Sequence, residues 1–252
     1  MLKREPLLSE AYFDQSIAFK ITVIERDDKA LATAPEQFAK PEVVALYLFS
    51  RRHALLMAEY SRGYSFQQLR SEFPKIIEAW EQLQRIDVKG TYSNSFTGDV
   101  EDYITSLWLI TQGQLLGVEP AVLRRTVACI GNEGQDLLFE RLVARLLPDV
   151  QRKPAKKLLY PKAYQSLYDC LDAAADQQMA LMQQFLANWY KRMNRTGWHD
   201  AHKAPNGGGF FGYWCWEAAG VAVAFGIDDA RFRNLPYYPK DLADFARSRV
   251  SG

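Results

Sequence analysis

The chain has 252 residues, of which 48% are hydrophobic and 24% are charged, and this is enough apolar material for one large domain or two small ones. Such a composition excludes an intrinsically disordered protein. The 31 Lys and Arg residues nearly balance the 30 Asp and Glu residues, and the formal charge is +1. The net charge therefore gives no general attraction to nucleic acid or to an anionic membrane.

The charge is distributed unevenly along the chain. Residues 1–150 carry 17 basic and 21 acidic side chains, a balance of −4, whereas residues 151–252 carry 14 and 9, a balance of +5. The first part of the chain is thus expected to suit a basic partner better than the second part.

The cysteines and the apolar segments indicate where the protein resides. Cys129, Cys170 and Cys215 lie far apart and form no CxxC pair, which favours reduced core thiols over a disulfide framework or a thiolate zinc site. The amino terminus lacks the continuous apolar core of a secretory signal, and the longest apolar stretch is interrupted by Glu217. We expect a cytoplasmic protein that does not associate with membranes.

Apolar residues at helical spacing predict helices through most of the first 150 residues. Pro41 suits a first helical turn and Gly63 suits the end of that helix. Ser65 and Gln68 form a capping-box pattern for the next helix, which Pro74 is expected to kink. The predicted helices cover residues 17–31, 41–63, 65–83, 99–116, 120–130 and 135–147.

The second part of the chain is also predicted to be helical. Residues 148–161 hold three prolines and a basic cluster, which indicates a boundary between domains at 1–150 and 151–252. Helices are then expected over residues 162–194, 213–225 and 240–249, with an irregular stretch up to Gly212. Since no alternating strand pattern occurs, the sequence predicts an all-α fold, a helical array of antiparallel helices in two packed lobes.

Three residues could be combined into a metal site. His199 and His202 lie three apart in a loop, and Glu217 could be a third ligand of a metal-assisted hydrolase. The histidines lack the fixed helical geometry of an HExxH motif, so structural histidines are the favoured interpretation. We expect no metal, no cofactor and no catalytic residue.

Glu217 is the only charge between Tyr213 and Ile227. A carboxylate in an apolar helix needs hydrogen-bond donors, or its pKa rises. The favoured interpretation is a buried structural anchor, and the expected partners are groups such as Trp198, His202, Lys203 and Tyr213.

A helical nucleic-acid-binding module is a second alternative, because many aromatic residues between Trp189 and Tyr238 accompany the basic second half. The basic residues are spread out instead of following one groove, and helix packing explains the aromatic residues more simply. Direct binding of nucleic acid is therefore not predicted.

Four segments of the last third form a recognisable combination: NWYKRMN from Asn188, WHDAHK from Trp198, GYWCWEAAGVAVAFGIDD from Gly212 and RFRNLPYYPKDL from Arg231. Together they resemble the signature of the PoNi family. Looser similarity is found in GYSFQQL at Gly63 and DYITSLWLITQGQLLG at Asp102.

The resemblance implies an all-α immunity protein that is not an enzyme. Members are paired with PoNe-type polymorphic DNase toxins, which are delivered between competing bacteria, as by type VI secretion, and they block the cognate toxin in the cytoplasm of the producing cell. The signature residues are expected to determine the fold: Trp198, His202, Tyr213, Trp214, Glu217, Tyr237, Tyr238, Pro239 and Asp241.

The expected partner suggests where to look for a binding surface. A nuclease presents a basic surface to DNA, so an inhibitor gains association rate and specificity by offering carboxylates to it. Five acids near loops of the acidic first part are the predicted toxin-binding residues, although for any single one an ordinary charge at the start of a helix is the favoured interpretation. They are Asp99, Glu101, Asp102, Glu133 and Asp136.

Overall fold

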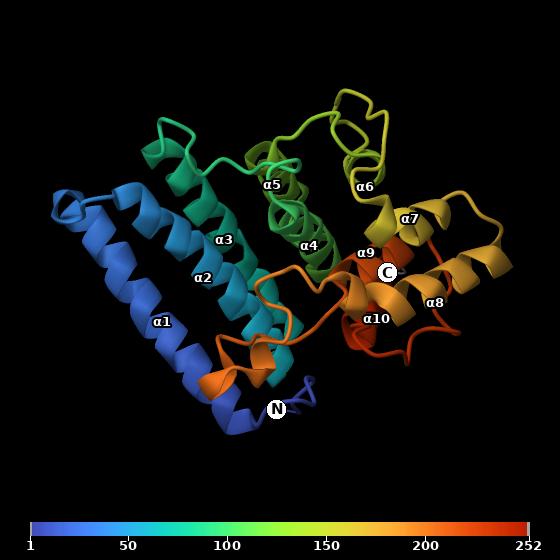
Figure 1. The fold of residues 1–252 in the computed structure, drawn as a ribbon, viewed down its shortest axis with the longest axis horizontal. Helices are drawn as coiled ribbons and strands as arrows, with labels where there is room; N and C mark the ends of the chain where they lie inside the picture. Colours follow the sequence, from blue (N-terminus) through green and yellow to red (C-terminus); the bar gives the residue numbers. More distant parts are fainter. Residues whose placement is uncertain (1, 251–252) are drawn as a thin grey trace. The chain divides into compact units, whose positions relative to one another are not determined.

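The computed structural model describes residues 2–250, and over this range its regular structure is helical, without strands (Figure 1). The predicted all-α fold is confirmed. The α-helices are α1 (Glu10–Thr33), α2 (Pro41–Arg62), α3 (Phe66–Ile86), α4 (Val100–Leu116), α5 (Pro120–Ile130), α6 (Leu137–Leu146), α7 (Pro161–Asp169), α8 (Ala175–Arg192), α9 (Trp216–Ala224) and α10 (Lys240–Val250). Short 3-10 turns occur at η1 (Pro35–Gln37), η2 (Ala201–Lys203) and η3 (Pro205–Gly207).

The chain divides into two compact units. Unit 1 consists of Met1–Ser93 and Asp200–Tyr213, and unit 2 consists of Asn94–His199 and Trp214–Gly252. This division differs from the predicted boundary at residue 150, because α4 and α6 pack against the later helix α9, and α5 packs against α4. That residues 1–150 and 151–252 fold as independent domains stays a prediction.

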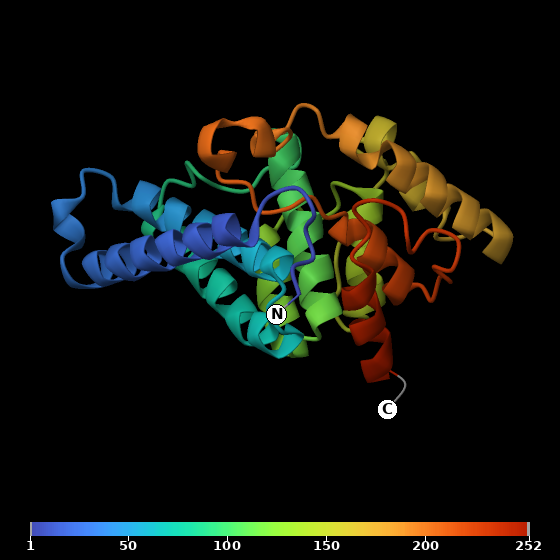
Figure 2. The ribbon, with the colours of Figure 1, turned by 90° about the horizontal axis from the view of Figure 1, so that it is seen from below.

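Unit 1 is built on three antiparallel helices, α1, α2 and α3, with α2 packed against both of the others (Figures 1 and 2). Local signals fix their ends. The Ser9 hydroxyl accepts a 3.1 Å hydrogen bond from the Tyr12 amide at the start of α1. Gly63 ends α2 at φ 107°, which favours glycine, and the capping box of Ser65 and Gln68 opens α3. The helix α3 continues through Pro74.

Residues 200–213 complete unit 1, although they come more than a hundred residues after α3. The Tyr12 hydroxyl donates a 2.8 Å hydrogen bond to the Phe210 carbonyl. The Phe210 ring is buried and lies 6.1 Å from the ring of Phe13. The amide of Tyr213 donates a 3.0 Å hydrogen bond to the buried Glu5 carboxylate. These contacts join the late segment to the first helix and to the residues before it.

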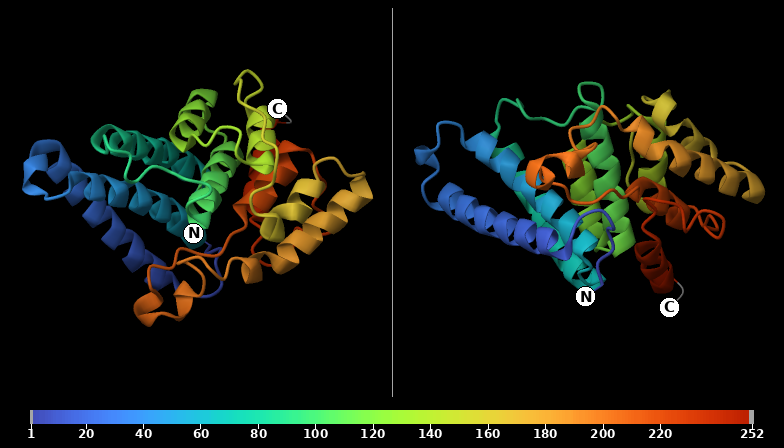
Figure 3. Two further views of the ribbon diagram at one scale, coloured as in Figure 1. Left: turned by 45° about the horizontal axis from the view of Figure 1, so that its top comes forward. Right: turned by 60° about the horizontal axis from the view of Figure 1, so that its bottom comes forward.

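In unit 2, α4 packs against α5, α9 and α10, and α7 packs against α8 (Figure 3). Gly220 allows α9 to approach α4 closely, because a Cβ at this position would lie 2.3 Å from the Thr111 methyl carbon. Almost every residue of α9 is buried, which agrees with its nearly all-apolar sequence.

The helical region predicted over residues 162–194 is not one continuous helix. The structure has two helices there, α7 and α8, with a break at residues 170–174. Ala174 is extended, and Cys170 and Leu171 are buried. The break allows α8 to pack back on α7, and this burial outweighs the helix propensity of the alanine-rich connection. The all-apolar helix also starts at Trp216, three residues later than predicted.

The cysteine prediction is confirmed, since Cys129, Cys170 and Cys215 are free and buried. Burial raises the pKa of the Cys170 thiol to about 12. Within residues 2–250, none of the helices combines the length and the apolar character needed to cross a bilayer.

Candidate functional site

The centre of unit 2 contains a carboxylate surrounded by aromatic donors. Glu217 lies in the first turn of α9 and is 0% exposed. Its Oε2 accepts a 2.9 Å hydrogen bond from the Trp108 indole, and its Oε1 accepts hydrogen bonds from the Trp189 indole at 2.7 Å and the Tyr164 hydroxyl at 3.3 Å. Burial raises the pKa of Glu217 to about 7, and these donors oppose the rise. One side chain thus connects α9 to α4, α7 and α8.

The expected partners of Glu217 are wrong, although its burial is as predicted. The Trp198 ring stacks on the ring of Trp189 at 5.6 Å and lies tilted against the ring of Trp108 at 5.2 Å. His202 belongs to unit 1, where its Nδ1 lies 2.8 Å from the Tyr213 hydroxyl. Long-range packing, and not proximity in sequence, selects the donors.

The remaining signature residues make contacts around the start of α10. The Tyr238 hydroxyl donates a 3.0 Å hydrogen bond to Asp229, which also pairs with Arg247 at 2.5 Å. Tyr237 has a positive φ of 71° and stacks on Tyr190 with ring centroids 5.2 Å apart. Pro239 and Asp241 lie at the beginning of α10. Trp214 lies before α9, and its ring is 6.4 Å from the ring of Trp216. These contacts support a structural role for the signature.

The predicted acids at the start of α4 all accept hydrogen bonds from backbone amides of unit 2. The exposed Asp99 is the N-cap and accepts a 2.9 Å hydrogen bond from the Glu101 amide. Asp102 accepts a 2.8 Å hydrogen bond from the Ser95 amide, and burial raises its pKa. The Glu101 carboxylate accepts a hydrogen bond from the Gly197 amide. Of the three, Asp99 is exposed, whereas Glu101 and Asp102 are half-buried.

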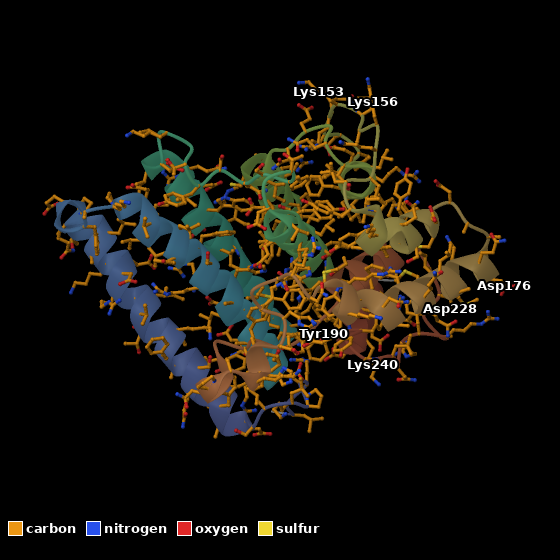
Figure 4. The ribbon with its side chains drawn as sticks, viewed as in Figure 1. Lys153, Lys156, Asp176, Tyr190, Asp228 and Lys240 are labelled. Carbon is orange, nitrogen blue, oxygen red and sulfur yellow. The ribbon has the colours of Figure 1, made fainter. Side chains whose placement is uncertain are left out.

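The other two predicted acids have different surroundings. Glu133 is exposed and accepts a 2.7 Å hydrogen bond from the amide of Lys153, on the basic loop that follows α6 (Figure 4). Asp136 is 0% exposed. It accepts hydrogen bonds from the Phe139 amide at 2.9 Å, the Tyr103 hydroxyl at 3.0 Å and the Leu159 amide at 2.8 Å. The Asp136 carboxylate is therefore internal, out of reach of a partner that approaches the surface of unit 2.

The histidines of the alternative metal site have other contacts. His199 stacks on the Tyr190 ring at 4.2 Å, whereas His202 contacts Tyr213. Across residues 2–250, no group of three or more His, Cys, Asp or Glu side chains is arranged to hold a metal ion. Nothing in the geometry favours a metal-assisted hydrolase.

Unit 1 contains an acidic groove that the sequence analysis missed. It has a volume of about 470 Å³ and is lined by α1, α2 and α3. Its charged side chains are Glu25 and Asp28 from α1, Arg52 and Glu59 from α2, and Glu72 and Lys75 from α3. We refer to this feature as the acidic groove.

Glu59 is the most buried charged residue of the groove, at 7% exposed. Asp28 pairs with Arg52, and Glu72 pairs with Lys75 at 2.8 Å. Among residues 2–250, the Glu59 carboxylate has no hydrogen bond or ion pair. Burial raises its pKa to about 7, with a further rise from Glu72 that Lys75 partly offsets.

One sequence signal could have revealed Glu59. It is the single charge in the run from Ala54 to Tyr60, and an isolated acid in an apolar stretch is the same signal that singled out Glu217.

Comparison with protein families identifies the chain. A model described as the N-terminal region of PoNe immunity proteins (PoNi) matches residues 4–128, and a model for their C-terminal region matches residues 134–242. The chain belongs to the PoNe immunity protein family. The two matches cover most of the chain, including the signature region and the acidic groove of this PoNi protein.

Among solved structures, the crystal structure of protein PA2201 from Pseudomonas aeruginosa is similar to the PoNi chain, with a TM-score of 0.72 and 19% sequence identity. The match covers 98% of this chain and 92% of that chain. At this identity the likeness establishes a shared helical fold. No curated protein matches the chain.

Proposed function

We propose that this protein binds a cognate PoNe-type DNase toxin directly and neutralises it, without catalysing a reaction itself. The observation that carries the proposal is the pair of PoNe immunity family matches, over residues 4–128 and 134–242. The toxin acts between competing bacteria, as in type VI secretion, and the immunity protein acts in the cytoplasm of the producing cell.

Charge complementarity is the physical basis of the proposed complex. A DNase needs a cationic surface to bind phosphates, and carboxylates placed against that surface compete with DNA. The exposed acids Asp99 and Glu133, with the half-buried Glu101, are candidates for such contacts. Nuclease–immunity pairs are among the tightest protein complexes known, so direct inhibition of this kind is energetically feasible.

The test is co-purification of the full chain with the nuclease domain encoded next to it, followed by a plasmid-degradation assay at an equimolar ratio. We expect a stable one-to-one complex that stops cleavage. The nuclease domain of a distant PoNe-type toxin is the matched control, and its activity should persist.

Two outcomes would overturn the proposal. One is undiminished plasmid cleavage by the cognate nuclease domain together with the absence of a complex. The other is inhibition of both toxins to the same degree, since an immunity protein is selective for its partner.

A further inference from the structure

We propose that the acidic groove of α1, α2 and α3 is a toxin-binding site, which accepts a lysine or arginine side chain from the DNA-binding surface of the toxin as an ion pair with Glu59. This inference rests on the proposed function and deepens it by naming the site. It assigns binding to residues of unit 1 that are distinct from the acids predicted near α4 and α6.

Within residues 2–250, the Glu59 carboxylate lacks a donor from the protein itself. A buried carboxylate without a donor is costly, and a buried charge is ordinarily paired. Glu59 is 7% exposed and lines an open groove, so its missing partner can enter from solvent. Glu217 in unit 2 shows the contrast, because its carboxylate is fully enclosed and has three donors from its own chain.

The charges around Glu59 also favour a cation. The cations of the groove, Arg52 and Lys75, are engaged by Asp28 and Glu72. Glu59 lies in the last turn of α2, where its carbonyl accepts hydrogen bonds from the amides of Gly63 and Tyr64, both at 3.0 Å. The end of a helix carries negative potential, which favours a cation and opposes a carboxylate.

The shape and polarity of the groove suit a basic side chain. Its volume of about 470 Å³ is more than tenfold the roughly 30 Å³ that one water molecule occupies. Apolar side chains also line it, including Ile21, which is 37% exposed, and Leu55. A lysine or arginine places its methylene groups against such surface while its charged end reaches a carboxylate. The groove therefore matches both parts of a basic side chain.

The test compares Glu59→Gln with Glu36→Gln in the full chain. Both variants remove one carboxylate from unit 1 with the same change in shape, but Glu36 is exposed and lies outside the groove. The dissociation constant for the nuclease domain of the cognate toxin is measured by surface plasmon resonance at two salt concentrations. We expect Glu59→Gln to weaken binding at least tenfold and to reduce its salt dependence, whereas Glu36→Gln stays within about twofold of the wild type.

The free energy of unfolding of Glu59→Gln distinguishes a loss of toxin contact from a loss of folded structure. Since the Glu59 carboxylate has no partner in the free protein, Glu59→Gln should leave the free energy of unfolding at neutral pH unchanged or higher. A residue that supports the fold would lower both stability and affinity when changed.

The binding experiment distinguishes a failure of the groove proposal from a failure of the proposed immunity function. If the wild type binds the toxin and Glu59→Gln binds equally well, the groove is not the site, and the immunity function stands. If the wild type does not bind, the proposed function fails, and the groove proposal fails with it. A dimer of the chain alone that Glu59→Gln dissociates would also overturn the proposal, because a second copy would then occupy the groove.

Discussion

The Trp189 indole nitrogen lies 2.7 Å from Oε1 of Glu217, and the Trp108 indole nitrogen lies 2.9 Å from Oε2 of the same carboxylate. Both indoles are buried, so each N–H needs an acceptor inside unit 2. Glu217 provides both acceptors from one side chain. The acid that the sequence offers as a possible metal ligand is thus occupied in holding α4 and α8 to α9.

Glu217→Ala is expected to lower the free energy of unfolding by about 3–5 kcal/mol, because it leaves two indoles and the Tyr164 hydroxyl unpaired and opens a cavity. Glu217→Gln should cost about 2 kcal/mol, since one indole N–H would face an amide NH₂. Urea unfolding followed by circular dichroism measures both. A loss below about 0.5 kcal/mol for Glu217→Ala would contradict the anchor role.

The pKa of Glu59 predicts a dependence of stability on pH. Its folded-state pKa of about 7 is above the ordinary value of 4.5, so the unfolded chain releases this proton first as the pH rises. Below pH 4.5 Glu59 has no effect on stability, and its destabilising effect grows between pH 4.5 and 7. Glu59→Gln and the wild type should therefore be equally stable at pH 4, and at pH 8 the variant should be more stable by on the order of 3 kcal/mol.

Urea titrations of both proteins at several pH values measure that difference. Glu36→Gln, which changes an exposed acid, should follow the wild type throughout. A constant difference between Glu59→Gln and the wild type from pH 4 to pH 8 would show that Glu59 titrates normally.

Asp136 and Glu133 should respond differently to loss of charge. Asp136→Asn replaces one acceptor oxygen of a buried N-cap with an amide, so a loss of about 1–3 kcal/mol in unfolding free energy is expected. Glu133→Gln, at an exposed position, should cost less than about 0.5 kcal/mol. Thermal and urea unfolding test this pair, and equal losses would contradict the burial difference between the two residues.

The three cysteines should be unreactive in the folded protein. All are buried, and burial raises the pKa values of Cys170 and Cys215, which removes the reactive thiolate. A thiol reagent such as Ellman's reagent at pH 8 should label none of them rapidly in buffer and all three in denaturant. Rapid labelling of one thiol in buffer would reveal local opening.

Sequence reasoning succeeded where the determinants are local. Gly63 ends α2, and Ser65 and Gln68 open α3, because caps and left-handed turns depend on a few adjacent residues. The buried cysteines also follow from composition. These features did not require knowledge of the tertiary structure.

Features that depend on contacts between residues distant in sequence could not be predicted. The donors to Glu217 come from positions 108, 164 and 189, and no local pattern points to them. The break at residues 170–174 was missed because the return of α8 onto α7 is a tertiary gain. In each case packing overrides the local preference.

Residues 1–150 and 151–252 differ in net charge, but the two folded units are both nearly neutral. Unit 1 carries 14 acidic and 14 basic side chains, and unit 2 carries 16 and 17. The balance of −4 over residues 1–150 therefore describes a stretch of chain and not a surface. Acidic character is local, as in the groove around Glu59, where it depends on which charges are already paired.

The late segment of unit 1 has a consequence for synthesis of the protein. Helices α1, α2 and α3 leave the ribosome long before residues 200–213, so the ring of Phe13 lacks its neighbour Phe210 until translation is nearly complete. During that interval the nascent chain displays apolar surface that the finished protein covers. Unit 1 therefore cannot complete its core until about the last fifth of the chain is being synthesised.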